Sequence, residues 1–366
     1  MIISPRLKTL LYLPLSQSFG YQLIGFLNKA LNLNLKVGFC VYAEERRFLD
    51  YFFFSWLAPY FQWRPTIVGY YTQGKVRGLI LAATFFDPRG RELLKAAQDG
   101  RLKNLVDRLG LIRNQVGAER RALAGVLPSV CHRYNIPIPD VDVDATPLAV
   151  STALAALLKI LKINYESEDY SLIILGSEGF VASRVYGLID EIISNIDRID
   201  AKCSLPGDFD EAVIRNQGKS QIILNCTGRG ELKKYFPDFN RYSLLRSKGE
   251  IDFFQVICDE VYPGLNEGDV QYLESVGVAY VRIGGIVVDK INPSFPDEYN
   301  AGGFVFPVGS EPINDIAEVF LREGVYMDKA LILPCCAAST PGPDDPPLRV
   351  AIKLANMPKW LAKRLA

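Results

Sequence analysis

The chain has 366 residues, of which 49% are hydrophobic and 22% are charged, and its 41 basic residues are balanced by 41 acidic residues. This composition is typical of a globular protein, and the length suggests two domains. Because the charges balance, no global positive field favours nucleic acid, and we expect no nucleic-acid partner.

Cysteine and histidine usage bears on the compartment and on metals. The cysteines are scattered, odd in number and set mostly in apolar surroundings: Cys40, Cys131, Cys203, Cys226, Cys258, Cys335 and Cys336. This pattern is typical of reduced thiols in a cytoplasmic protein. His132 is the only histidine and no Cys-x-x-Cys pair occurs, so a zinc site of standard spacing has no ligand set and we expect no metal.

We expect residues 1–147 to form an N-terminal α/β domain that binds the substrate. Met1–Asn28 has a basic, apolar start without a small-residue cleavage site, which is typical of mature sequence. The patterns that follow predict three strands, one helix, and a strand or turn: strands Lys36–Tyr42, Thr66–Tyr71 and Val76–Ala82, the helix Gly90–Leu109, and the strand or turn Leu123–Cys131.

Tyr51–Trp63 carries no charge and is rich in aromatic residues, yet it is too short to span a bilayer. We interpret it as a buried helix or as the wall of a hydrophobic pocket, which would favour an apolar substrate. A patch that contacts a membrane surface is the alternative.

Residues 148–310 alternate between helix and strand, as a parallel doubly wound sheet requires. The predicted helices are Val150–Ile163, Phe180–Ile193 and Asp269–Ser275, with a helix or loop at Phe209–Asn216. The predicted strands are Leu172–Leu175, Ile199–Ser204, Ser220–Leu224, Ile251–Cys258 and Ala279–Ile283. We therefore expect a Rossmann-like domain of the α/β class.

Residues 311–366 are expected to form a C-terminal helical return and a tail. Ser310 as an N-cap, with a proline in the first turn, predicts a helix at Ile313–Leu321. Met357–Ala366 is basic and amphipathic and contains Trp360. We interpret this tail as a helix docked on its own fold or on a second subunit, and binding to an anionic membrane is the alternative.

Ser171–Ala182 is the most informative stretch, because an apolar strand runs there into Gly-x-x-Gly-x-x-Ala and then into a helix. Gly176 permits a sharp turn, and Gly179 lets the backbone approach a pyrophosphate in front of the helix N-terminus. The motif therefore predicts a dinucleotide site. Its candidate residues are Gly176, Ser177, Gly179, Phe180 and Val181.

Two features of this stretch leave the ligand open. Glu178 places a carboxylate in the turn, which costs phosphate affinity unless it faces solvent, so a purely structural turn is the alternative. About 20 residues further on, an acid would favour NAD and a base would favour NADP. Asp197, Arg198 and Asp200 fall together there, and the sequence does not decide between the two cofactors.

Two further glycine-rich segments follow predicted strands, at the edge where ligands bind in such sheets. In the first segment, Asn225–Gly230, Arg229 could meet a phosphate or an acid, and an exposed strand-to-helix turn is the alternative. In the second segment, Gly284–Gly285, a flat ring could lie against the backbone. We expect these segments to line the nicotinamide and its ribose through Asn225, Thr227, Gly228, Gly284 and Gly285.

No triad of nucleophile, base and orienting acid is visible. His132 cannot be assumed to activate Cys131, because neighbouring side chains in a strand point to opposite faces. Cys335 and Cys336 have no visible base, so we interpret them as buried, inert thiols. The remaining candidates for catalysis are polar residues near predicted turns: Ser129, Asp144, Thr146 and Asp315.

Taken together, these motifs resemble the aldehyde-forming fatty acyl-ACP (acyl carrier protein) reductases. Leu123–Ser129 resembles the family's Leu-Gly-Gly-Phe-x-Ser, Asp144–Pro147 its Thr-Thr-Gly-Asn turn, Gly176–Ala182 its Gly-x-x-Gly-x-x-Gly, Gly284–Val287 its Gly-Gly-Ile-Val, and Ile316–Glu318 its Phe-Ala-Glu. The resemblance runs from about Lys75 to Leu321. It implies an N-terminal substrate domain followed by an NADPH-binding Rossmann domain.

One departure from this family concerns its chemistry. The family's acyl-accepting cysteine directly precedes Phe-Ala-Glu, and this chain has Asp315 there. Because an aspartate cannot form the thioester that hydride reduces, the resemblance implies the fold and the cofactor rather than acyl-thioester reduction. The turns are equally similar to those of shikimate and methylene-tetrahydrofolate dehydrogenases, where hydride transfer needs no covalent enzyme intermediate.

We therefore expect an oxidoreductase that uses NAD or NADP to transfer hydride to or from a carbonyl or acyl-derived group in an interdomain cleft. The partner would be a small-molecule substrate. A Rossmann-fold protein that binds a ligand or a partner without catalysis is the alternative. A second copy of the chain and a membrane surface are further candidate partners.

Overall fold

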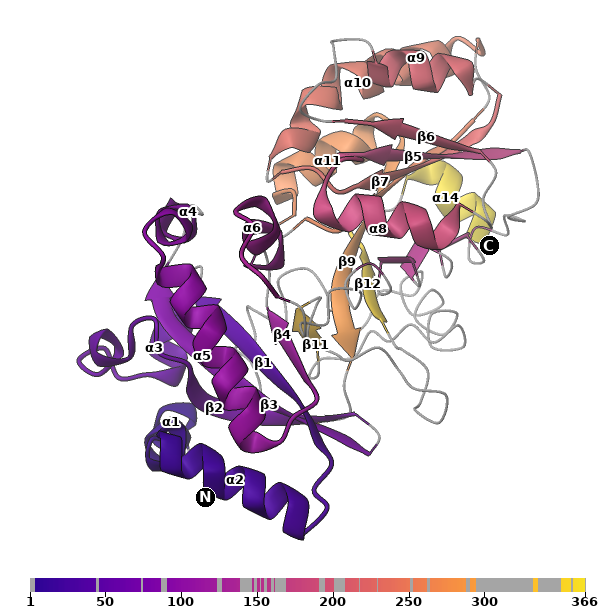
Figure 1. Ribbon diagram of the computed structural model, residues 1–366. Coiled ribbons are helices and arrows are strands. Elements are labelled where there is room, and N and C mark those ends of the chain that lie inside the picture. Colours follow the sequence, from indigo (N-terminus) through magenta and orange to yellow (C-terminus); the bar gives the residue numbers. More distant parts are fainter. Residues whose placement is uncertain are drawn as a thin grey trace. The chain divides into compact units, whose positions relative to one another are not determined.

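The computed structural model describes most of the chain (Figure 1). The described residues are 4–43, 46–73, 75–86, 91–123, 127–138, 147, 150–151, 153–154, 157–158, 161, 169–190, 195–200, 208–216, 218–228, 230–250, 253–261, 264–287, 290–293, 332–334, 350–356 and 358–365. The chain divides into two compact units. Unit 1 comprises residues 1–145, 286–300 and 329–348, and unit 2 comprises residues 146–285, 301–328 and 349–366.

Unit 1 is built on a five-stranded mixed sheet with the strand order β10-β2-β3-β1-β4. β1 runs parallel to β3 and to β4, whereas β2 is antiparallel to both of its neighbours. The second and third predicted strands are present as β2 and β3, which form a hairpin. The strands are β1 (Leu35–Ala43), β2 (Thr66–Gln73), β3 (Val76–Phe86), β4 (Arg120–Leu123) and β10 (Lys290–Asn292).

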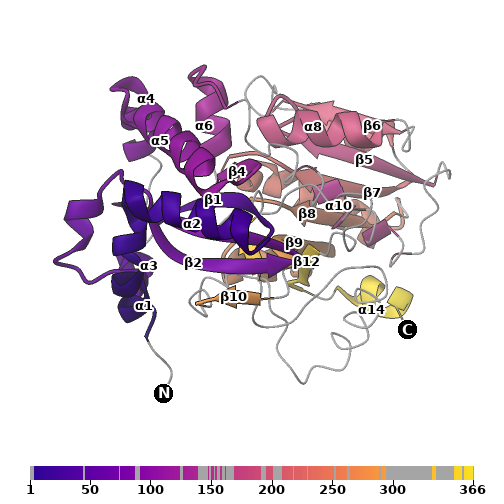
Figure 2. The same ribbon diagram turned by 60° about the horizontal axis from the view of Figure 1, so that its bottom comes forward.

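Helices cover both faces of this sheet. Adjacent residues of β1 point to opposite faces, so Cys40 joins a core with α5 while Val41 joins a second core with α3. α4, α5 and α6 lie together on one side of the strands (Figure 2). The helices are α1 (Pro5–Tyr12), η1 (Pro14–Ser16), α2 (Ser18–Ala30), α3 (Arg46–Phe52), η2 (Ala58–Phe61), α4 (Arg91–Gln98), α5 (Arg101–Val116) and α6 (Leu127–Arg133).

Two predictions for unit 1 were wrong. The single helix expected over Gly90–Leu109 is two helices, because Gly100 has a φ of +83° and ends the helical path between α4 and α5. The strand or turn expected over Leu123–Cys131 is mostly the helix α6, in which Leu127, Val130 and Cys131 are buried. Their i, i+3, i+4 spacing is the helical period, which the short apolar run concealed.

The aromatic segment Tyr51–Trp63 is divided between the core and the surface. Phe52 and Phe53 are buried in the core on the α3 face of the sheet. Trp56 and Tyr60, by contrast, are 66% and 70% exposed. The prediction of a buried segment therefore holds for its first part only.

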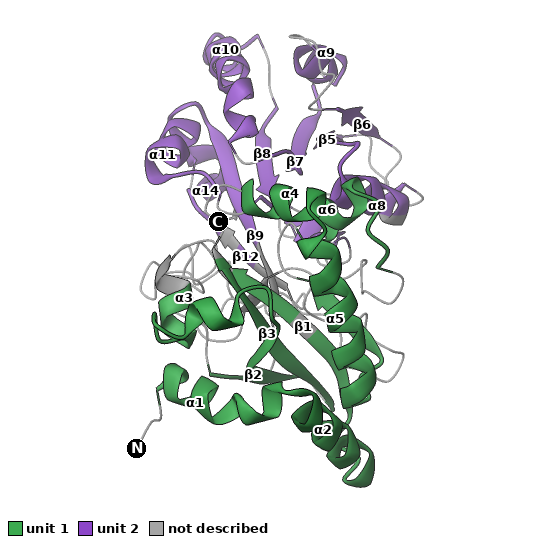
Figure 3. Cartoon of the chain, turned by 60° about the vertical axis from the view of Figure 1, so that its left-hand side comes forward, with its two compact units in different colours: residues 1–145, 286–300, 329–348 green, residues 146–285, 301–328, 349–366 purple. Residues whose placement is uncertain are grey.

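Unit 2, purple in Figure 3, contains a parallel sheet with the strand order β6-β5-β7-β8-β9. β12 pairs with β9. In order of sequence the five parallel strands are arranged 2-1-3-4-5, which is the doubly wound, flavodoxin-like order. The strands are β5 (Tyr170–Leu175), β6 (Ile196–Ile199), β7 (Ser220–Asn225), β8 (Gln255–Asp259), β9 (Val278–Val287) and β12 (Val350–Leu354). The short strand β11 (Ile332–Pro334) belongs to the residues of unit 1.

Both faces of the unit 2 sheet are covered by helices. α9 and α10 lie on one side of β5 and β7, and α8 lies on the other side (Figure 1). β5 is buried along its whole length, which explains why its sequence is a continuous apolar run rather than an alternating one. The helices are α8 (Phe180–Ile189), α9 (Asp208–Arg215), η3 (Glu231–Tyr235), α10 (Phe236–Ser247), α11 (Glu267–Ser275) and α14 (Lys359–Leu365). The α/β class predicted from the sequence is confirmed.

The tail helix α14 docks on unit 2, as one of the two interpretations of its sequence predicted. The Trp360 indole N–H donates to the carbonyl of Gly277 at 2.7 Å, and its ring stacks on Phe254 with 4.6 Å between centroids. The strand expected at Ile199–Ser204 begins earlier, at Ile196, and α10 was not predicted. Within the described part of the chain, no helix is both long enough and apolar enough to cross a membrane.

Candidate functional site

The candidate site lies at the carboxyl edge of the unit 2 sheet, where β5 and β7 are neighbours. The chain leaves β5 toward β6 on one side and continues to β7 on the other. Such a reversal of direction is where open parallel sheets bind their ligands, just beyond the carboxyl ends of the strands. The turn that follows β5 and the turn that follows β7 meet at this point, because the Cys226 N–H donates to the Leu175 carbonyl at 3.0 Å.

The turn after β5 can be built only with glycine at Gly176. Its φ is +79°, and a Cβ atom there would lie 2.7 Å from the carbonyl oxygen of Cys226. The Gly179 N–H closes the turn by donating to the Gly176 carbonyl at 2.8 Å. The predicted sharp turn is therefore present, and it brings the backbone of Gly176 against the turn that follows β7.

Most of the N–H groups within this turn are used inside the protein. Gly176 and Ser177 both donate their N–H groups to the carbonyl of Ile199 at the end of β6, at 2.8 and 3.1 Å. The N–H groups that this helix start offers a phosphate are those of the first turn of α8, with Val181 among them. Gly179 is the N-cap residue and has no side chain to satisfy them. The phosphate-binding capacity of the motif thus lies in the helix start.

The side chains of the turn leave that helix start accessible to an anion. Glu178 faces solvent with its side chain 65% exposed, so the condition under which its carboxylate is tolerated is met. The Ser177 side chain is nearly buried, with the residue 3% exposed. The Ser177 hydroxyl is therefore a minor candidate for binding a phosphate.

Arg198 and Asp197 on β6 point to different neighbours. The Arg198 guanidinium lies 3.9 Å from the Glu178 carboxylate and 4.4 Å from the centre of the Tyr186 ring. Asp197 instead accepts hydrogen bonds from Arg215, at 2.6 Å, and from Asn216. The basic side chain of Arg198, rather than the acidic side chain of Asp197, therefore lies beside the glycine turn.

The turn after β7 is held by a buried polar network. The Asn225 amide nitrogen donates to Asp259 at 2.7 Å, and its amide oxygen accepts from the Thr227 hydroxyl at 2.7 Å. Asp259 also accepts from the Tyr280 hydroxyl and from the Val261 N–H. Burial raises the pKa of the Asp259 carboxyl, an effect that these donors only partly offset. Asn225 and Thr227, both predicted to line the nicotinamide, instead have their side-chain groups engaged within the network.

Glu260 is a candidate that the sequence reasoning missed. It directly follows β8, and its N–H donates to the Asn225 carbonyl at 3.2 Å. Burial, reinforced by the neighbouring Asp259, raises the pKa of the Glu260 carboxyl to about 7. A carboxyl group with such a pKa can take up or release a proton near neutral pH, as a general acid or base must. Its position after an apolar strand is the signal that could have found it.

The thiols near this edge are poor nucleophiles. Burial, together with the negative charge of Glu260, raises the pKa of Cys226 well above its ordinary value. The thiol of Cys258 on β8 is fully buried and its pKa is raised in the same way. A thiol that stays protonated at neutral pH does not attack a carbonyl efficiently.

The other predicted site residues are not brought together at this edge. Gly284 and Gly285 lie within β9, which continues to Val287, so the expectation that they follow a strand was wrong. Gly228 is in the turn after β7, where its carbonyl accepts from the Glu231 N–H at 3.0 Å. Ser129 is a half-buried residue of α6 in unit 1.

Several predictions fall on residues outside the described part of the chain. They concern Asp144, Thr146, Arg229, Asp315, Cys335 and Cys336 together with the helix expected at Ile313–Leu321. Cys131, which is described, is a buried residue of α6 whose pKa is raised to about 11 by burial. Among the described residues, no cluster of three or more histidine, cysteine or acidic side chains is placed to hold a metal ion.

Comparison with known proteins assigns this chain to no family. The chain matches no model of a protein family and no curated protein. Among solved structures, it is similar to the transcription regulator CcpA of Lactococcus lactis at 10% identity, over 84% of this chain and 100% of that one, with a TM-score of 0.24. A likeness at this level carries no argument about fold or function.

Proposed function

We propose that unit 2 binds NADP or NAD at the turn after β5, and that the protein is an oxidoreductase acting on a carbonyl or acyl-derived group of a small molecule. One observation carries the proposal. The glycine turn and the uncapped start of α8 lie at the point where the strand order of a parallel sheet reverses. The pyrophosphate would be held by N–H groups of the first turn of α8, with that of Val181 among them, in front of the helix dipole.

We further propose that the cofactor is NADP rather than NAD. Arg198 lies beside the turn, near the end of the second strand, where the adenosine ribose is expected. Its guanidinium suits the additional phosphate of NADP. Asp197, the acid that could have accepted hydrogen bonds from the free ribose of NAD, is engaged by Arg215 and Asn216.

Glu260 is the group that we propose for proton transfer. The nicotinamide of a bound cofactor supplies or accepts hydride, and a carbonyl that becomes a hydroxyl also needs a proton. A carboxyl group with a pKa near 7 carries that proton in part of the population at neutral pH. Asp259 beside it keeps this pKa high and, through Asn225, fixes the backbone from which Glu260 extends.

A dinucleotide-binding protein without catalysis is the second candidate. It is favoured by the engagement of Asn225, Thr227, Asp259 and Tyr280 in a network that leaves few polar groups for a substrate.

We also propose a cytoplasmic location. The same unpaired thiols that argue against nucleophilic chemistry support it, because thiols stay reduced in that compartment.

Titration of the purified protein with NADPH and with NADH, followed by cofactor fluorescence, tests the proposal. We expect saturable binding of both, with NADPH binding more tightly. Binding with no turnover of a panel of aldehydes, ketones and acyl thioesters would support the second candidate. No binding of either cofactor at millimolar concentration would contradict both candidates.

A further inference from the structure

The helix α2 in unit 1 carries an apolar stripe that faces solvent. Phe19, Leu23 and Phe26 are spaced by four and three residues, so they lie on one face of the helix. They are 76%, 38% and 68% exposed. Exposed aromatic and aliphatic side chains gathered on one helix face mark an interaction surface rather than ordinary surface composition.

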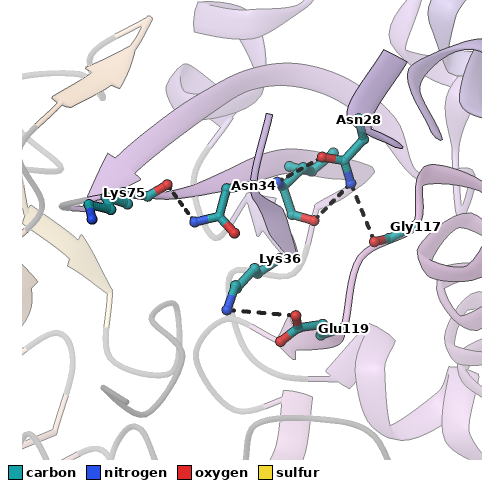
Figure 4. Close-up of polar contacts among 7 residues, drawn as sticks. Asn28, Asn34, Lys36, Lys75, Gly117 and Glu119 are labelled. Carbon is teal, nitrogen blue, oxygen red and sulfur yellow. Dashed lines mark hydrogen bonds and ion pairs between the residues drawn. The ribbon is translucent and has the colours of Figure 1, made fainter. Parts of the chain in front are cut away.

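The orientation of α2 is fixed, so this stripe cannot turn inward. Asn28 accepts from the Leu35 N–H at 3.0 Å and donates to the carbonyls of Leu35 and Val116, both at 3.2 Å. It also donates to the Gly117 carbonyl at 3.4 Å (Figure 4). Gly25 packs so closely on α5 that a Cβ atom would meet the Gln115 carbonyl oxygen at 2.0 Å. These contacts hold the opposite face of α2 against the protein.

The apolar surface continues beyond α2. On α1, Leu7 and Leu11 are exposed, one helical turn apart. The Arg6 guanidinium lies over the ring of Phe54 at 5.9 Å, and that ring stacks near Trp56, itself an exposed side chain. Tryptophan at the border of an apolar surface is typical of proteins that contact the headgroup region of a bilayer.

A cavity of about 390 Å³ opens at the N-terminal end of the stripe. The residues that line it include Ser18, next to Phe19, and two arginines, Arg64 and Arg108. No acidic residue lines it. Neither arginine forms an ion pair within the described part of the chain, although Arg101 and Arg241 elsewhere do. The cavity therefore offers uncompensated positive charge beside an apolar surface.

Charge along the first part of the sequence has the same sign. Residues 1–43 contain four basic residues, Arg6, Lys8, Lys29 and Lys36, and no acidic residue. Lys36 is paired with Glu119 at 3.7 Å, so only the other basic residues count toward attraction of an anionic surface. A helix with a large apolar face and basic residues near it is attracted to negatively charged lipid. The complementary surface is one that offers phosphate groups above an apolar layer.

We propose that α1, α2 and the cavity form a docking site for the surface of an anionic phospholipid bilayer. Phe19, Leu23 and Phe26 enter the boundary of the acyl layer, and Arg64 and Arg108 hold a lipid phosphate in the cavity. This interaction is independent of dinucleotide binding by unit 2. It keeps the protein at a membrane surface.

Flotation of the full-length protein with lipid vesicles tests the proposal. We expect it to float with vesicles of phosphatidylcholine and phosphatidylserine and to float far less with phosphatidylcholine alone, and binding should weaken as salt is added. Replacing Phe19 and Phe26 by Ser should reduce bound protein at least about tenfold. Replacing Arg64 and Arg108 by Gln should remove the preference for phosphatidylserine.

The matched control replaces two exposed apolar residues of unit 2, Ile214 and Leu244, by Ser, and we expect flotation to be unchanged. Circular dichroism of each variant checks that it is folded. Equal flotation of the Phe19 and Phe26 variant and the wild type would overturn the proposal. So would a wild type that sediments as a dimer and becomes monomeric in that variant, because the stripe would then cover a second copy. Binding of inorganic phosphate without binding of vesicles would also overturn it.

Discussion

The turn after β5 and the turn after β7 share one edge of the same sheet but are stabilised differently. The first depends on backbone conformation, with Gly176 at a positive φ and N–H groups left at the start of α8. The second depends on side chains, with Asn225, Asp259 and Tyr280 linking three neighbouring strands. The first turn therefore leads into a helix start without a side-chain cap, whereas the second turn is held by its own side chains.

The largest loss of stability is expected when the buried polar network at the turn after β7 is broken. Asp259→Ala leaves the Asn225 amide and the Tyr280 hydroxyl buried without their acceptor, so we expect a loss of about 3 kcal/mol in the free energy of unfolding. Urea denaturation measures it. Asp259→Asn keeps an acceptor oxygen in the same place and should cost clearly less. If the two variants are equally stable, the network does not hold this edge.

A smaller loss of stability is expected in the turn after β5. Gly176→Ala introduces a Cβ atom 2.7 Å from the Cys226 carbonyl oxygen at a φ of +79°, so we expect a cost of about 2 kcal/mol. Gly187→Ala is the control, since a Cβ atom on that residue of α8 would meet nothing within 4 Å. That substitution should be neutral or stabilising. A Gly176→Ala variant as stable as the wild type would remove the argument from backbone conformation.

Cofactor preference should depend on Arg198 alone. Arg198→Ala is expected to weaken NADPH binding about tenfold and to leave NADH binding nearly unchanged, because only NADPH carries the additional phosphate. Isothermal titration with each cofactor measures both affinities. Arg215→Ala removes an arginine that faces Asp197 instead, and should change neither affinity. An equal loss of affinity for both cofactors in Arg198→Ala would contradict the preference for NADP.

A pH dependence of stability is expected from Glu260. Its pKa in the folded protein, about 7, lies above its ordinary value of 4.5, so the folded state binds the proton more tightly than the unfolded state. The stability that this provides is fully present below pH 4.5 and is lost as the pH rises through 7. In Glu260→Gln we expect this decline to be smaller by up to about 3 kcal/mol, since each pKa unit corresponds to about 1.4 kcal/mol. Thermal unfolding across this range measures it, and parallel curves for variant and wild type would exclude a raised pKa.

Sequence patterns predicted the strands and the glycine turn of unit 2 well, because each is a local feature. A buried strand is a continuous apolar run, and a sharp turn before a helix needs glycine, so β5 and Gly176 could be recognised without any tertiary contact. β6 was misplaced because its sequence, Ile-Asp-Arg-Ile, carries two charges within four residues.

The network could not be predicted in the same way. Asn225 and Asp259 are 34 residues apart and meet only because β7 and β8 pair in register. The raised pKa of Glu260 depends on burial and on Asp259, neither of which a local pattern reveals. Gly284 was placed after a strand because β9 is longer than its apolar core.

NADPH titration of a Val181→Asp variant tests most directly whether the start of α8 holds a dinucleotide. The added carboxylate lies in the first helical turn, where it suits the helix dipole and should leave the fold intact, yet it repels a phosphate. Gly187→Asp adds the same charge farther along α8 as the control. We predict that Val181→Asp weakens NADPH binding at least about tenfold while Gly187→Asp binds as the wild type does. Unchanged NADPH affinity in a folded Val181→Asp variant would contradict the proposed site.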